Sequence, residues 1–331
     1  MTSNATDRPK ARLVTVSADE AGQRLDNFLG RFLKGVPKSR LYRAIRKGEV
    51  RVNKGRIAQT YRVKADDVVR IPPIASGEQV KTTPSRYDWS EHVLSEDARF
   101  LVIDKPSGWA VHGGSGVSAG VIESLRVFYE DRPYLELAHR LDRSTSGVLV
   151  VAKKRSALRA LHAALREGEV AKEYLLLVSG DWQLGDHLVD VPLDVSTRRG
   201  GERTVRVAAD GLSAATRFSL CDTYGDVSLI RARPATGRTH QIRVHAAHAG
   251  HPIVGDNRYG DADVNRRMQR FGANRLFLHS ASLAFEHPEG FPRHFSSPLP
   301  DDLRAVIDQL ETRGRHRTPR SLERAARQGK R

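Results

Sequence analysis

The sequence predicts an α+β protein of two domains, as its apolar patterns and its charge distribution indicate. Beyond residue 90, short apolar runs typical of strands outnumber stretches with helical periodicity, and the two kinds alternate irregularly. Residues 1–86 hold 19 Lys and Arg against 8 Asp and Glu, residues 312–331 hold 8 against 1, and the part between is nearly neutral. A chain of 331 residues is long enough for two domains, and the first is expected to be basic.

The composition excludes several classes of protein. A single cysteine, Cys221, cannot support a disulfide framework or a cysteine-rich zinc site, and its strand-like neighbours predict a buried thiol. No apolar run is long enough to span a bilayer, and the first ten residues lack the apolar core of a secretory signal. We therefore expect a cytoplasmic protein without a membrane segment.

Shifts in composition divide the chain into five parts. Two regions with periodic apolar residues are separated by a polar, Pro- and Ser-containing stretch, and the arginine-rich end has no apolar stripe. The expected parts are a disordered tail at 1–12, a small basic domain at 13–75, a linker at 76–90, a large domain at 91–311 and a basic disordered tail at 312–331.

The expected elements follow from the spacing of apolar residues. In the small domain they are helices at 25–33 and 40–47, separated by Gly35 and Pro37, a strand and turn at 50–56, and a strand at 66–71. In the large domain they are strands at 100–103, 148–152, 174–178, 214–220 and 227–232, and helices at 120–129, 156–166, 241–249 and 303–310.

Seven basic side chains of the small domain are predicted to form one cationic surface. Those of the second helix lie opposite its apolar positions, and those of the strand and turn follow directly in the chain. A solvated surface is the alternative, but a continuous patch suits phosphate contacts, which position a nucleic acid without reading its bases. The seven are Arg40, Arg43, Arg46, Lys47, Arg51, Lys54 and Arg56.

The segment 139–152, HRLDRSTSGVLVVA, places one carboxylate, Asp142, between Arg140 and Arg143 at the entrance of an apolar strand. Nearby cations favour the ionised form of a carboxyl group, which makes Asp142 a candidate base or nucleophile. A structural salt bridge is the alternative for so short a string, and the residues of this segment alone do not decide between the two.

Three further strings carry alternatives of the same kind. Tyr174 in AKEY at 171–174 opens an apolar strand, where an aromatic side chain often belongs to the core. The histidines around PATGRTHQIRVH at 234–245 suggest zinc, but neither cysteines nor a His-Glu-x-x-His pattern supports it. The string at 114–119 formally matches a dinucleotide fingerprint but does not directly follow the preceding strand, as that motif requires.

Together these strings resemble the RluA-type RNA pseudouridine synthases. The resemblance is carried by HRLDRSTSG at 139–147, AKEY at 171–174, PATGRTHQIRVH at 234–245 and DKPSG at 104–108. Residues 24–71, with RLDNFL and GEVRVNKGR, are similar to the S4 RNA-binding module. The resemblance implies a mixed, mainly antiparallel sheet in the large domain and a reaction that requires no cofactor and no metal.

The resemblance also implies roles for single residues. Asp142 would be the catalytic residue that initiates cleavage of the glycosidic bond of a flipped-out uridine, and Tyr174 would pack on the base and accept its proton. Arg140 would enter the RNA stack at the vacated position. An arginine of the string at 234–245 would pair with the Asp142 carboxylate. Arg238, on the glycine turn, is the expected one, and Arg243 is the less favoured candidate, which suits a helix surface.

The resemblance extends to family members that modify the large ribosomal subunit. It implies large-subunit (23S) ribosomal RNA or a pre-ribosomal particle as partner, with the protein acting as a monomer. Two other classes are less consistent with the residues. A non-catalytic assembly factor has no need of the Asp, Tyr and Arg set, and an S4-bearing methyltransferase would need a glycine-rich cofactor loop directly after a strand.

Overall fold

The computed structural model describes residues 11–33, 36, 38–74, 86–113, 119–132, 134–197 and 203–312. Its contacts divide the chain into two units, Met1–Thr83 and Pro84–Arg331, each with its own apolar core. Most of both expected tails, most of the expected linker, and the residues Gly35 and Pro37 lie outside the described residues. The boundaries drawn there from the sequence therefore stay predictions.

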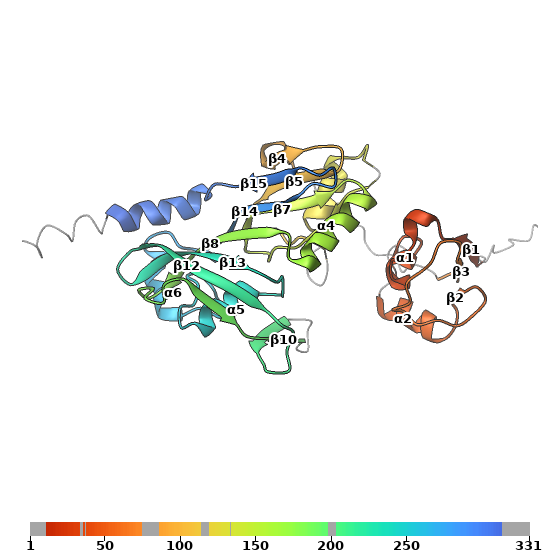
Figure 1. The fold of residues 1–331 in the computed structure, drawn as a ribbon, viewed down its shortest axis with the longest axis horizontal. Helices are drawn as coiled ribbons and strands as arrows, with labels where there is room; N and C mark the ends of the chain where they lie inside the picture. Colours follow the sequence, from red (N-terminus) through yellow and green to blue (C-terminus); the bar gives the residue numbers. More distant parts are fainter. Residues whose placement is uncertain are drawn as a thin grey trace, which may run out of the picture. The chain divides into compact units, whose positions relative to one another are not determined.

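The N-terminal unit contains two short helices against a small antiparallel sheet (Figure 1). The sheet has the strand order β1-β3-β2, and Val69 on its buried face belongs to one apolar cluster with Phe28 and Leu41 of the helices. Both expected helices and both expected strands are present. The elements are β1 (Arg12–Thr15), η1 (Ala18–Glu20), α1 (Leu25–Gly30), α2 (Lys38–Arg46), β2 (Arg51–Val52) and β3 (Val68–Ile71).

A two-residue turn follows β2 and projects basic side chains into solvent. Val52 and Gly55 exchange backbone hydrogen bonds of 3.1 and 2.9 Å across Asn53 and Lys54. These two residues have φ angles of 49° and 67°, the left-handed conformation that a turn of this kind needs and that asparagine tolerates. The turn leaves Lys54 and Arg56 exposed.

The C-terminal unit is built on one mixed sheet with the order β4-β5-β7-β14-β8-β13-β12-β9. Strand β15 pairs with β14, and β6 pairs with β7. Among the described strands, β7 and β14 form the one parallel pair, so the sheet is mainly antiparallel, as expected. The strands are β4 (Val93–Glu96), β5 (Phe100–Lys105), β6 (Glu136–Leu137), β7 (Ser146–Ala152), β8 (Ala171–Ser179), β9 (His187–Asp190), β12 (Ala215–Thr223), β13 (Val227–Pro234), β14 (Leu278–Glu286) and β15 (Pro292–Ser296).

Helices cover both faces of this sheet. One apolar cluster packs Leu149 of β7 with Leu125, and another packs Val150 with Leu161, so all seven residues of β7 are buried. A separate hairpin pairs β10 with β11. These elements are η2 (Ser90–His92), α3 (Val121–Phe128), α4 (Arg155–Glu167), β10 (Leu193–Thr197), β11 (Arg203–Val207), α5 (Gln241–His248), α6 (Ala262–Gln269) and a helix at residues 301–312. Within the described ranges, none of the helices has both the length and the apolar character needed to cross a membrane.

Cys221 differs from the expectation, because its thiol is exposed rather than buried. Strand β12 pairs with β9 only over Ala215 to Phe218, and its register with β13 shifts between Leu220 and Asp222. The residues of β12 after Phe218 therefore extend beyond the part of the strand that is paired with β9. The apolar neighbours that predicted a buried thiol do not all face the core, and Leu220 is itself exposed.

Replacing Gly147 by alanine is expected to destabilise the C-terminal unit by roughly 3 kcal/mol, the sum of backbone strain and overpacking. Gly147 has a φ angle of 107°, and a Cβ atom there would lie 2.2 Å from the Ser280 carbonyl oxygen, where β7 meets β14. Thermal unfolding measures the effect. Gly168→Ala is the matched control, because Gly168 has a φ angle of 79° but no atom within 4 Å of the added group. Equal losses in both variants would contradict the close approach.

Candidate active site

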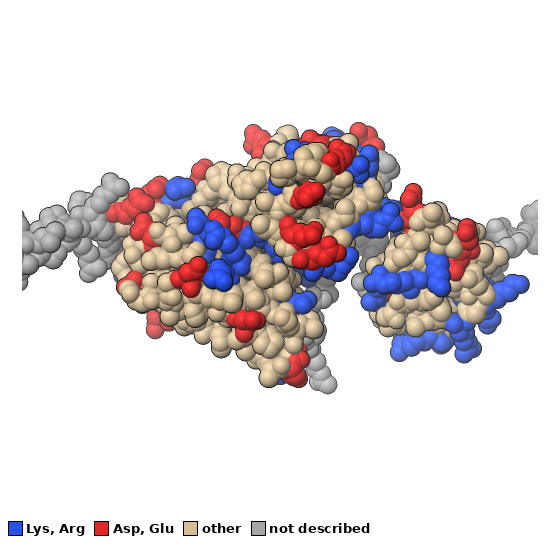
Figure 2. All heavy atoms as spheres, in the orientation of Figure 1, with Lys and Arg blue, Asp and Glu red and all other residues tan. Residues whose placement is uncertain are grey.

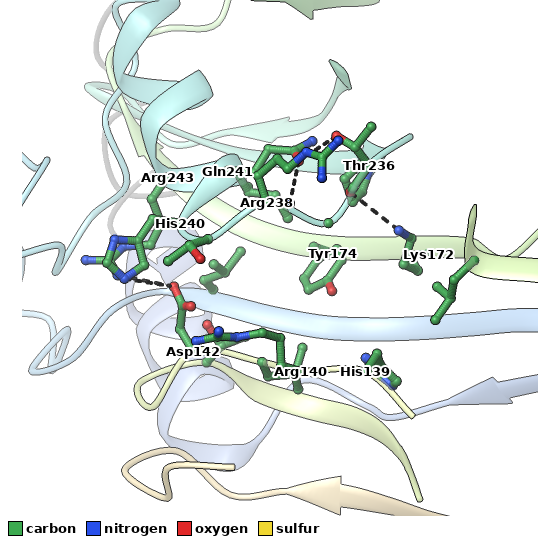
Figure 3. A pocket seen from close by; sticks show the side chains of 18 of the residues that line it. His139, Arg140, Asp142, Lys172, Tyr174, Thr236, Arg238, His240, Gln241 and Arg243 are labelled. Carbon is green, nitrogen blue, oxygen red and sulfur yellow. Dashed lines mark hydrogen bonds and ion pairs between the residues drawn. The ribbon is translucent and has the colours of Figure 1, made fainter. Parts of the chain in front are cut away.

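A cavity of about 270 Å³ opens in the C-terminal unit where two loops meet the start of a strand (Figure 3). The loop between β6 and β7 contributes Asp142, the start of β8 contributes Tyr174, and the turn between β13 and α5 contributes residues 236–240. The three strings singled out in the sequence are thus brought to one place, although up to about a hundred residues separate them. Arg140 and Lys172 also line the cavity.

The loop that carries Asp142 is fixed by its backbone. The amide of Thr145 donates to the Asp142 carbonyl at 3.1 Å, which closes a turn immediately after the aspartate. The amide of Gly108 donates to the Arg143 carbonyl at 2.9 Å, and Arg143 Nε donates back to the Gly108 carbonyl at 2.9 Å. Arg143, for which the sequence indicated no role, therefore joins the aspartate loop to the loop after β5.

Lys105, from the DKPSG string, supports the same junction from inside the fold. Its side chain is fully buried, and Nζ donates to the carbonyl oxygens of Pro106, Trp109 and Arg143 at 2.9, 2.9 and 3.2 Å. Burial lowers the pKa of Lys105 to about 7, and the charge of Asp142 is among the groups that oppose this shift. An ammonium group has three N–H donors, so the three carbonyl groups match the protonated form.

The arginine that contacts Asp142 is Arg243. Its Nη1 lies 3.2 Å from Asp142 Oδ2. The expectation that Arg238 makes this pair is wrong: its exposed side chain donates from Nε to the Ser213 carbonyl at 3.1 Å. Arg238 lies in the turn before α5, whereas Arg243 lies in the first turn of the helix and projects toward the cavity (Figure 3).

A second carboxylate holds Arg243 in place. Nε and Nη2 of Arg243 donate to the two oxygens of Asp256 at 2.7 and 2.8 Å, and the Asp256 side chain is fully buried. Burial raises the pKa of Asp256, but the bonds from Arg243 and from the Arg258 and Tyr259 amides outweigh it, so the net shift is downward. A bidentate pair of this kind fixes the guanidinium plane and leaves Nη1 directed at Asp142.

His240 lies on the other side of the aspartate. Its Nε2 is 3.9 Å from Asp142 Oδ2, and its Nδ1 is 2.9 Å from the Tyr259 hydroxyl. Burial lowers the pKa of His240, while the charge of Asp142 raises it in part. Two neighbouring histidines form hydrogen bonds away from Asp142. His245 bonds to Thr216 Oγ1 at 2.9 Å, and His251 bonds to the Ser179 carbonyl at 2.7 Å. Their arrangement is that of packing residues in and around the turn.

Tyr174 lies on the floor of the cavity. On β8 it is paired in register with Ala232 of β13 and Ser280 of β14, and its side chain is buried. Burial raises the pKa of Tyr174 to about 12, and the charge of Asp142 adds to the shift. The phenol is therefore neutral at neutral pH and presents its ring and hydroxyl group to the cavity.

The remaining basic candidates lie on exposed surfaces. Arg140 is exposed at the rim of the cavity. Lys and Arg side chains also project from the N-terminal unit, where Asp and Glu are fewer (Figure 2). Of the seven predicted there, all except Arg40 are exposed, and Arg40 is half-buried and paired with Glu49 at 3.3 Å.

The first part of the fingerprint-like string, residues 114–118, lies outside the described residues.

The cavity residues Asp142, Tyr174 and Arg243 all lie in the part of the chain that matches a known family. The chain matches the RNA pseudouridylate synthase family over residues 99–248 and the S4 domain over residues 23–69. It belongs to the RNA pseudouridylate synthases and is an RNA pseudouridine synthase with an N-terminal S4 domain.

Individual relatives cover nearly the whole chain. It is 52% identical to the ribosomal large subunit pseudouridine synthase C of Yersinia pestis, over 91% of this chain and 96% of the relative. It is 50% identical to the protein of that name from Escherichia coli strain K12, over 92% and 98%. Human RNA pseudouridylate synthase domain containing 4 shares the fold, with a TM-score of 0.56 and 23% identity over 67% of this chain and 94% of that one.

Proposed function

We propose that this pseudouridine synthase converts specific uridines of large-subunit ribosomal RNA to pseudouridine. The observation that carries the proposal is the carboxylate of Asp142, oriented by Arg243 in a cavity floored by Tyr174. The relatives that are about half identical over nine tenths of the chain are named for the large ribosomal subunit, which supports the choice of RNA.

In this proposal Asp142 initiates the cleavage of the bond between C1′ of the ribose and N1 of uracil. Its side chain is 18% exposed, so a ribose that enters the cavity can reach it. Arg243 orients the carboxylate, and Asp256 orients Arg243. The reaction moves one bond within a nucleotide and exchanges a proton, so the chain's own side chains can supply every group that it needs.

Tyr174 is proposed to pack against the detached base. The sequence predicted two roles for Tyr174, contact with the base and removal of the proton from C5. Proton removal requires the phenolate form, which a pKa of about 12 disfavours at neutral pH. The buried environment of Tyr174 therefore supports the packing role more strongly than the role of proton acceptor.

Arg140 is proposed to occupy the RNA stack after the uridine leaves it. The reacting atoms are inaccessible inside a stacked helix, so the nucleotide has to be flipped out before it can enter the cavity. Arg140 is exposed at the rim, two residues from Asp142, where a planar guanidinium can contact the flanking bases.

The substrate can be tested by tritium release. Uridine labelled at C5 loses its label to water when C5 becomes bonded to C1′. We expect release from large-subunit rRNA, offered free or in subunits from cells lacking the enzyme, and none from small-subunit rRNA. Release from the small-subunit rRNA alone would refute the proposed substrate, and no release from any of them would refute the proposed function as a whole.

RNA affinity is expected to fall about a thousandfold between 50 and 200 mM salt, because about six phosphate contacts produce a loss of this size. Arg43→Gln, Arg46→Gln and Lys47→Gln together should reduce the slope of log affinity against log salt by roughly 2, at about 0.7 to 0.9 per contact. Arg62→Gln is the control, because Arg62 is exposed on the same unit but lies outside the predicted surface. A salt dependence that is weak, or equally altered by both sets, would contradict the assignment.

We further propose that the protein acts as a monomer in the cytoplasm. The described cavity takes Asp142, Tyr174 and Arg243 from one chain, so a second copy is not needed to complete it. The proposed location is that of the ribosomal RNA on which the protein would act.

A further inference from the structure

Lys172 lies in the active-site cavity with no assigned role. It is two residues before Tyr174 on β8, so both side chains lie on the same face of the sheet and both line the cavity. Figure 3 shows Tyr174 between Asp142 and Lys172, with the amine directed toward the turn that carries Thr236. Residues two apart on a strand are separated by roughly 7 Å, which is comparable to the span of a uracil ring with its carbonyl group.

The ammonium group of Lys172 is poorly satisfied by the protein. Within the described residues it makes one hydrogen bond, from Nζ to the Thr236 carbonyl, and this bond is 3.5 Å long. Across the described parts of the chain, no carboxylate forms an ion pair with it, and burial lowers the pKa of Lys172 with no opposing charge. Lys105, by contrast, is fully buried and has three carbonyl acceptors. A half-buried ammonium group with one long hydrogen bond is costly to the fold, so Lys172 is a candidate for a group that the substrate completes.

We propose that Lys172 donates a hydrogen bond to the uracil carbonyl group opposite the glycosidic bond and stabilises the negative charge of the detached base. The proposal rests on the proposed reaction and adds a residue to it. With C1′ beside Asp142 and the base on Tyr174, the far edge of the ring points along β8 toward Lys172.

In the proposed rearrangement, this hydrogen bond would stabilise the base at two stages. When the N1–C1′ bond breaks, its electron pair stays with the base, and the charge spreads onto the carbonyl oxygens. The base then turns about its N3–C6 axis, which exchanges N1 with C5 and O4 with O2. The C5–C1′ bond forms, C5 loses its proton and N1 gains one. Lys172 donates first to O4 and then to O2, and it exchanges no proton.

Lys172→Met is expected to lower kcat by about 100-fold, as the loss of one donor to a developing anion typically does, while KM changes little. The melting temperature of Lys172→Met should match or exceed that of the wild type, because the variant removes a half-buried charge that has no ion pair among the described residues. Lys172→Arg should retain more activity than Lys172→Met. Arg231→Met is the matched control: Arg231 faces the opposite side of the sheet, where it pairs with Glu173 at 2.6 Å, and kcat should be unchanged.

An atomic substitution in the RNA tests the contact itself. In a short RNA carrying the uridine that the wild type modifies, 4-thiouridine replaces the O4 acceptor with sulfur, a weaker acceptor. We expect this to slow the wild type and to add nothing to the defect of Lys172→Met, with nucleosides separated by chromatography as the readout. Equal penalties in both enzymes, an unchanged kcat in Lys172→Met, or a loss in KM alone would overturn the proposal. A wild type inactive on the uridine RNA would instead refute the proposed function.

Discussion

Asp142→Asn is expected to abolish pseudouridine formation, lowering kcat by about 10⁴-fold or more, as loss of a residue that bonds to or deprotonates the substrate does. Asparagine has the shape of aspartate and keeps an oxygen that can accept from Arg243, so the cavity should be preserved. It cannot act as a nucleophile or as a base at this site. The measurement is pseudouridine formed per enzyme in a single turnover, with enzyme in excess over RNA.

The control separates chemistry from binding. Asp263→Asn makes the same change at an exposed carboxylate on α6 and should leave the rate unaltered. RNA affinity of Asp142→Asn should equal that of the wild type, because the proposed phosphate contacts lie in the N-terminal unit. If the asparagine variant retained more than a small fraction of turnover, the assignment of Asp142 would be wrong. If it also lost RNA affinity, the change would not be confined to the chemical step.

Local structure and the shared location of the strings were predictable from the sequence. The seven residues of β7 are apolar or small because both faces of the strand are covered. The sequence therefore shows an uninterrupted run of such residues, which predicts a buried strand. Asp142 and Tyr174 were expected in one site because their strings belong to one family pattern, and the cavity contains both. Seven strands of two to five residues were not predicted, since too few residues carry a period: β1, β4, β6, β9, β10, β11 and β15. The nine-residue strand β14 was missed as well.

The partner of Asp142 was not predictable, because tertiary geometry alone decides it. Arg238 and Arg243 are five residues apart in one string, and the glycine turn favoured the first. The contact joins residues 101 positions apart and depends on the direction in which the first turn of α5 projects. Asp256 was missed as well. A signal was present in GDNRYG at 255–260, where an aspartate precedes an arginine and a tyrosine, but only the fold places it beneath Arg243.

Arg243→Lys is expected to lower kcat by about 100-fold, while Arg238→Lys should cost little. Lysine keeps the charge but cannot bond both oxygens of Asp256 and still reach Asp142, so the carboxylate loses its orientation. Misplacement of a catalytic group by about 1 Å can cost a factor of this size. The two variants change equivalent groups in one string, and single-turnover rates compare them. A larger loss in Arg238→Lys than in Arg243→Lys would instead support the pairing of Arg238 with Asp142 that the sequence suggested.

Asp256→Asn is expected to destabilise the C-terminal unit by about 3 kcal/mol, the size typical of breaking a buried ion pair. The net downward shift in the pKa of Asp256 means that its ionised form stabilises the fold above about pH 4, and that this contribution is lost as the pH falls through the folded-state pKa. The difference in denaturation midpoint between wild type and variant should therefore be largest at neutral pH and shrink below pH 4. Asp226→Asn, which removes the exposed pair with Arg267, should change little at any pH. A difference that persisted unchanged into acid would show that Asp256 stabilises the fold through packing and not through its charge on Arg243.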